Sequence, residues 1–139
     1  MFDWDGIDTC WSGRRLNITG VRYDPGRQYR AHQSIGGGVQ SDELWSTPLY
    51  QSFLQLRGQN VPREEVDTIV LQSMFGLGAG FTMRDLAVNV VATANNLFPT
   101  GPHAGVFEAN FRSLEILPAP AAVATPTGAA SQASPLSKQ

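Results

Sequence analysis

The sequence predicts an α+β fold, in which a small antiparallel sheet is packed by two or three helices. Three observations favour it: apolar and polar residues alternate on both sides of a turn near residue 25, apolar residues recur at helical spacing through the middle of the chain, and alternation returns near residue 110. Because the helical segments are grouped between the strands and do not alternate with them, a doubly wound sheet is disfavoured.

The first predicted element is an N-terminal hairpin over residues 16–35. Apolar and polar residues alternate up to Gly20, which shifts the phase of the alternation as a β-bulge does. Asp24-Pro25-Gly26 predicts the turn, since Pro presets φ at the second position and Gly accepts a positive φ. We expect the return strand from Tyr29 to Ile35, and the three glycines at 36–38 to end it.

Two helices are predicted in the middle of the chain. The first is expected from Pro48, capped by Thr47, to about Gly58. The second is expected over residues 62–75, with acidic residues near its positive N-terminal end. Residues 68–71 are apolar and β-branched enough to form a buried strand instead, so both interpretations stay open and helix is favoured.

The clearest helical pattern runs from Met83 to Phe98, where apolar residues fall on one face. Thr82 is a good N-cap, and Pro99 ends the helix. A C-terminal strand is then expected over residues 106–117, as the third strand of the sheet. One face of that strand would carry Phe107, Ala109 and Phe111.

Composition changes at Pro118, which divides the chain into a globular domain at 1–117 and an extended C-terminal arm at 118–139. The arm is mostly Ala, Pro, Ser, Thr and Gly, and such a segment buries too little apolar surface to offset its ordering entropy. We therefore expect the arm to be disordered by itself, and to be ordered only where contacts outside its own fold hold it. The candidate contact residues of the arm are Pro118, Pro120, Val123 and Leu136.

Composition and charge exclude several classes of function. An apolar share of 42 % indicates a globular protein with a core, and a net charge of −2 is too small to imply a nucleic-acid partner through its field. The N-terminal residues lack the pattern of a signal peptide, and no apolar run reaches the roughly 20 residues of a membrane span. We expect synthesis in the cytoplasm and no membrane partner.

Two short motifs resemble ligand sites and fail on their spacing. Asp3, Asp5 and Asp8 do not match a calcium loop, because the positions that need Gly and the final Glu hold other residues. The glycines at 76, 78 and 80 lack the third Gly, the preceding strand and the following acid of a dinucleotide fingerprint. We expect no cofactor and no metal.

Cys10, His32 and His103 are the residues that an enzyme of this sequence would use. A catalytic thiol needs a lowered pKa and an orienting base, and nothing in the spacing brings these three residues together. With a single Cys and two His, a zinc site also has too few ligands. The sequence favours ordinary packing or surface roles for all three.

Five arginines are concentrated in the predicted hairpin and directly before it, close to aromatic residues. Arg and aromatic side chains are enriched at protein–protein hot spots and can also bind nucleic acid. An exposed charged face of the hairpin, with the aromatic residues in the core, stays open as the alternative. Of the two kinds of partner, protein is favoured because the net charge is acidic. The residues of this candidate surface are Arg14, Arg15, Arg22, Tyr23, Arg27 and Arg30.

Two functional hypotheses follow. The favoured one is a non-enzymatic structural subunit whose C-terminal arm contacts neighbouring subunits, most concretely a small bacteriophage virion protein of the capsid or tail. The alternative is a small-ligand-binding protein or minor enzyme with a pocket between helices and sheet.

Overall fold

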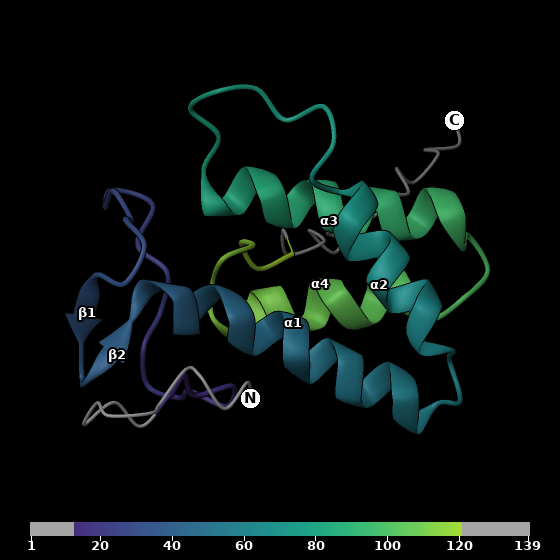
Figure 1. Cartoon of the computed structure of the whole chain (residues 1–139), viewed down its shortest axis with the longest axis horizontal. Coiled ribbons are helices and arrows are strands. Elements are labelled where there is room, and N and C mark those ends of the chain that lie inside the picture. The colour runs from purple at the N-terminus through teal and green to yellow at the C-terminus, as the bar shows by residue number, and fades with distance from the viewer. Residues whose placement is uncertain (1–12, 121–139) are drawn as a thin grey trace, which may run out of the picture.

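The computed structural model describes residues 13–120, and this part forms four helices and one two-stranded antiparallel sheet (Figure 1). The predicted α+β class is confirmed. In chain order the elements are β1 (Ser34–Gly36), β2 (Val39–Gln40), α1 (Ser41–Gly58), α2 (Arg63–Gln72), α3 (Met83–Leu97) and α4 (His103–Ser113).

The hairpin lies further along the chain than the sequence predicts. The turn at Asp24 does form, since its backbone carbonyl accepts a hydrogen bond from Arg27 N–H at 3.1 Å. The residues around the turn do not pair as strands, because their backbone groups form hydrogen bonds with the helical bundle. The Tyr23 N–H, for example, donates to the Leu114 carbonyl at 2.8 Å. The pairing is instead between β1 and β2, across the glycines at 36–38, whose φ values are all positive.

Helix α1 begins seven residues earlier than expected, at Ser41 in place of Pro48. Asp42 and Glu43 lie in its first turn, where the positive end of the helix dipole favours carboxylates. Glu43 also accepts a hydrogen bond from the Gln40 backbone N–H at 2.9 Å, which satisfies one donor at the helix start. Pro48 therefore lies inside the helix, fully buried, although it lacks a backbone donor.

The second and third helices follow the predictions. Helix α2 settles the open choice at residues 68–71 in favour of helix. Helix α3 begins after Thr82 as expected, and a capping box holds its start: Asp85 N–H donates to Thr82 Oγ1 at 3.2 Å, and Thr82 N–H donates to Asp85 Oδ2 at 2.8 Å.

The predicted C-terminal strand at 106–117 is wrong, because residues 103–113 form helix α4. Phe107 and Phe111 are fully buried, but Ala109 between them is exposed, so the three do not share a face. Residues four apart lie on one side of a helix, and this period fits the two phenylalanines as well as alternation does.

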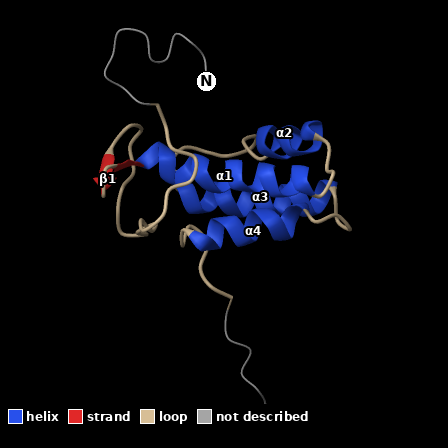
Figure 2. Cartoon of the chain, turned by 90° about the horizontal axis from the view of Figure 1, so that it is seen from below, coloured by secondary structure: helices blue, strands red, loops and turns tan. Residues whose placement is uncertain are grey.

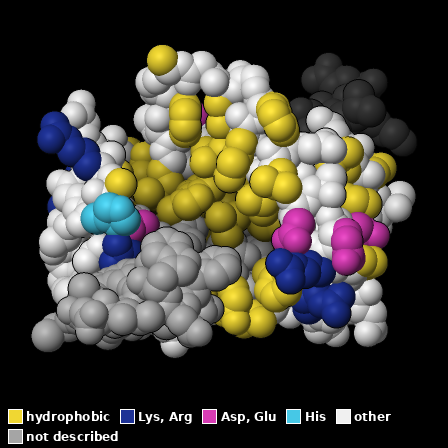
Figure 3. Space-filling model, in the orientation of Figure 1, with side chains coloured by type: hydrophobic (Ala, Val, Ile, Leu, Met, Phe, Trp, Pro, Cys, Tyr) yellow, Lys and Arg dark blue, Asp and Glu magenta, His cyan; other side chains and the backbone are white. Residues whose placement is uncertain are grey.

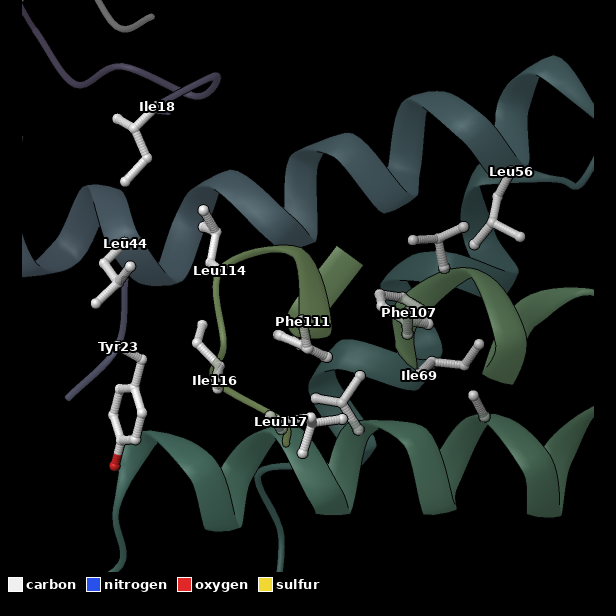
Figure 4. Packing of buried hydrophobic residues seen from close by; sticks show 14 of the residues in the cluster. Ile18, Tyr23, Leu44, Leu56, Ile69, Phe107, Phe111, Leu114, Ile116 and Leu117 are labelled. Carbon is white, nitrogen blue, oxygen red and sulfur yellow. The ribbon is translucent and has the colours of Figure 1, made fainter. Parts of the chain in front are cut away.

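Helix α4 contacts both α1 and α3, and their shared core includes Phe107, Phe111 and Leu56 (Figure 4). After α4 the chain turns back, and Leu114, Ile116 and Leu117 complete this core. Ile18 and Tyr23 add to it from the irregular segment before β1. Segments near both ends of the described chain therefore pack against the same helical bundle.

Residues 118–120 are exposed, and Leu117 before them is the last buried residue of the part described. In Figure 2 they leave on the α4 side of the bundle, whereas the first described residues enter on the side that carries α2. The domain boundary at Pro118 stays a prediction. Among residues 13–120, no helix is long and apolar enough to cross a bilayer.

Candidate functional site

Arg14 and Arg15 of the predicted interaction surface bind the irregular N-terminal segment to the first turn of α1. Arg14 Nε lies 2.8 Å from Asp42 Oδ2. Arg15 donates its backbone N–H to Glu43 Oε1 at 2.8 Å, and its guanidinium lies 3.3 Å from Glu43 Oε2. These contacts join residues 28 positions apart and give both arginines a structural role.

The same contacts lower the pKa values of the two carboxyl groups. Burial alone would raise the pKa of Asp42, but hydrogen bonds from backbone N–H groups, including that of His32, and the charge of Arg14 outweigh it. Burial opposes ionisation of Glu43 in the same way, and the N–H groups of Arg15 and Gln40 with the Arg15 guanidinium lower its pKa. Both groups are therefore held as carboxylates.

The other residues of the predicted surface also contact their own fold. Arg22 Nε lies 3.4 Å from Glu115 Oε1, and Arg27 donates to the Ser34 and Ile35 carbonyls at 2.9 and 3.2 Å. Tyr23 is buried and stacks on Tyr29, with the ring centroids 5.3 Å apart.

Arg30 contacts its own fold through its backbone N–H, which donates to Gln33 Oε1 at 3.1 Å, and its exposed side chain lines a cavity. Pro118 and Pro120 are exposed, and Val123 and Leu136 lie outside the described residues. A partner contact by any residue of the candidate surface or the arm stays a prediction.

The candidate catalytic residues meet different partners. His32 is exposed, and its Nδ1 lies 2.8 Å from Asp42 Oδ2. His103 is buried at the start of α4, and its Nε2 lies 2.9 Å from Glu65 Oε2 of α2. Cys10 lies outside the described residues. Within residues 13–120, no three His, Cys, Asp or Glu side chains gather in a way that could hold a metal ion.

The small-ligand hypothesis expects a pocket between helices and sheet. A cavity of about 260 Å³ does lie between the segment before β1, α1 and the start of α3. Trp45, Phe81 and Leu86 supply apolar walls, and Arg30 and Asp42 supply charge. Neither histidine is among its lining residues, and its volume is below the roughly 300–1,000 Å³ of typical ligand pockets.

A larger apolar groove lies between α1 and α2. It has a volume of about 520 Å³, and we call it the α1–α2 groove. Arg63 and Asp67, an exposed ion pair at 3.0 Å, lie at its rim. Its apolar lining residues are Leu16, Leu49, Tyr50, Phe53, Val66, Val70 and Leu71.

The connection from α2 to α3, residues 73–82, carries three large apolar side chains at its surface. Met74, Phe75 and Phe81 are 50 %, 78 % and 51 % exposed, and we call them the apolar loop. In Figure 3 apolar side chains gather in the middle of the face that Figure 1 views, between α1 and this loop and across α3 and the upper end of α2. Contiguous apolar surface of this kind marks an interaction site more often than scattered residues do.

The apolar loop was not predicted, because Met74 and Phe75 fall inside the helix expected over residues 62–75, whereas α2 ends at Gln72. Gly76 and Gly80 do have positive φ values, so they shape the loop as such residues do. The signal that could have identified it is the pair Met74-Phe75 directly after a helix and before a glycine, where a solvated loop would have polar residues. Comparisons of the chain with protein-family models, with curated proteins and with solved structures found no match.

Proposed function

We propose that this protein is a non-enzymatic structural subunit of a larger protein assembly, and that the apolar loop is the surface on which a neighbouring subunit docks. The observation that carries the proposal is the exposure of Met74, Phe75 and Phe81 on one ten-residue connection. Phe and Met are enriched at protein interfaces, and Met adapts its shape to an irregular partner.

The loop is held at both ends, which supports docking by a largely preformed surface. At its start, Asn89 of α3 donates a side-chain hydrogen bond to the Ser73 carbonyl, and Ser73 itself is buried. At its end, the capping box of Thr82 and Asp85 fixes the entry into α3. Fixing a loop before binding reduces the entropy that association costs.

The C-terminal arm provides the second contact in this proposal. Residues 118–120 leave the bundle on the α4 side, whereas Met74 and Phe75 directly follow α2. A contact between two different surfaces of successive copies is heterologous, and such contacts build rings or filaments. The bacteriophage capsid or tail accessory protein predicted from the sequence is an assembly of this kind and stays a prediction.

The test is the oligomeric state of the full chain, measured by mass photometry over a concentration series. We expect assemblies larger than a monomer, and we expect Phe75→Glu to dissociate them because a charge would be buried at the contact. Leu97→Glu is the matched control, since Leu97 is 38 % exposed at the last residue of α3, the end opposite the one that Thr82 caps. A wild-type chain that stays monomeric, or that loses assembly equally in both variants, would contradict the proposal.

A further inference from the structure

The α1–α2 groove is formed by two helices, and its apolar residues repeat along each of them. Leu49 and Phe53 of α1 are four residues apart, as are Val66 and Val70 of α2, so each pair lines one side of the groove. A groove between two helices is a common acceptor for an amphipathic helix, which binds with residues at i, i+3, i+4 and i+7.

The chain itself carries a segment with this spacing. Among residues 1–12, Trp4, Ile7 and Trp11 are spaced at i, i+3 and i+7, which would place them on one face of a helix. Trp is also the side chain most enriched among binding hot spots.

The lengths of segment and groove agree. Trp4 and Trp11 are seven residues apart. The side of the groove that α1 forms, which we call the α1 wall, runs from Ser46 to Phe53, which are also seven residues apart. Seven residues of helix correspond to about 10 Å. One face of the segment therefore matches the length of the α1 wall.

The place where the described chain begins brings the segment to the groove. Leu16 is itself one of the lining residues, and its carbonyl accepts a hydrogen bond from Gln51 Nε2 of α1 at 2.8 Å. Arg14 and Arg15 between Trp11 and Leu16 are held at Asp42 and Glu43, which lie about one helical turn before Ser46 at the end of the groove. The segment therefore starts about one helical turn from the Ser46 end of the groove and would run from there along the α1 side.

We propose that residues 1–12 bind the α1–α2 groove of the same chain, with Trp4, Ile7 and Trp11 facing Leu49, Phe53 and Val70. A free helix of twelve residues is marginal in water, so the helical spacing of Trp4, Ile7 and Trp11 would become a helical face only through this contact. The groove thus has an occupant of its own, and the apolar loop stays available to another subunit.

Acrylamide quenching of tryptophan fluorescence in the full chain tests this proposal. The chain has three tryptophans, and the Trp4→Phe/Trp11→Phe double variant gives the contribution of Trp45 for subtraction. We expect Trp4 and Trp11 to be quenched several-fold less than in a free peptide of residues 1–12. Tyr50→Glu, at a groove residue that is 40 % exposed, should raise their quenching towards that of the peptide.

Two further variants keep the test decisive. Leu71→Glu, at a groove residue that is 61 % exposed, should act as Tyr50→Glu does and is placed too far outside the core to unfold the bundle. Val88→Glu, at an exposed residue of α3, should leave quenching unchanged. Quenching in the wild type equal to that of the peptide, or unaffected by both groove variants, would overturn the proposal. Protection that disappears on dilution would assign the groove to a second copy and overturn it as well.

Discussion

Gly101 lies directly against the imidazole of His103: a Cβ atom at position 101 would be 2.5 Å from Nδ1 and 2.9 Å from Cε1. The ring has little room to move, because it stacks on Phe98 with the centroids 4.3 Å apart and its Nε2 contacts Glu65. This arrangement fixes the tight connection between α3 and α4.

We therefore expect Gly101→Ala to lower the free energy of unfolding by about 1–3 kcal/mol, as overpacking of a rigid site does. Gly105→Ala is the control, since a Cβ there meets nothing within 4 Å and Gly105 lies inside α4. That variant should raise stability by about 0.5–1 kcal/mol, because Ala favours the helix. Urea unfolding measures both, and equal effects of the two variants would show that the His103 contact is unimportant.

Glu43 is expected to make stability depend on pH in the acid range. Its pKa in the folded state is lower than its ordinary value of 4.5, so its contribution is fully present above that value and is lost as the pH falls through the folded-state pKa. Glu43→Gln should cost about 1–3 kcal/mol at pH 7, because hydrogen bonds from Arg15 and Gln40 lose their charged acceptor.

Urea unfolding at pH 7 and below pH 3 tests this assignment, with the exposed Glu64 replaced by Gln as the matched control. The difference between wild type and Glu43→Gln should shrink at the lower pH, as the pH falls towards the lowered folded-state pKa of Glu43. A difference that stays constant between the two pH values would mean that charge at position 43 contributes nothing.

Thr82→Ala should destabilise the chain by about 1 kcal/mol, as loss of an N-cap does. The variant removes the hydroxyl that accepts from Asp85 N–H, and it also removes the hydrogen bond that lowers the pKa of Asp85. Thermal unfolding followed by circular dichroism measures the loss. Thr82→Ser keeps the hydroxyl and should retain most of the stability, so similar losses in both variants would argue against capping.

Removal of the predicted arm should weaken assembly and leave the fold intact. A chain that ends at Leu117 keeps the last buried residues and every helix of the described part. We expect its unfolding midpoint in urea to match that of the full chain, and its assemblies in mass photometry to be smaller. An unchanged size distribution would remove the arm from the proposed function.

The parts of the fold predicted correctly are those whose signals are local. Helix α3 has an N-cap at Thr82, helical spacing and a stop at Pro99, and all three signals agree. The turn at Asp24 was also predicted, because Pro and Gly determine it within four residues.

The errors arise where a partner far along the chain decides the structure. Whether residues before Asp24 pair as a strand depends on Leu114, whose carbonyl takes the Tyr23 N–H. In the segment at 106–117, the spacing of Phe107 and Phe111 fits the alternation of a strand as well as the period of a helix. The segment forms a helix because it packs against α1 and α3.

The candidate site was predicted only in part for the same reason. The arginine cluster is visible in the sequence, but the Asp42 and Glu43 carboxylates that hold Arg14 and Arg15 lie 28 positions away. Exposure of Met74, Phe75 and Phe81 depends on where the bundle leaves its surface open, and the local pair Met74-Phe75 before Gly76 marks the stretch only as unusual for a solvated loop.

The proposed function depends most on whether the apolar loop is covered by a neighbouring subunit. Hydrogen exchange of the backbone amides of residues 73–82, measured by mass spectrometry at low and at high protein concentration, tests this directly. We predict slower exchange in this loop at high concentration, with no change in residues 86–97 of α3. Equal exchange of the loop at both concentrations, in a sample whose mass shows assembly, would contradict the account.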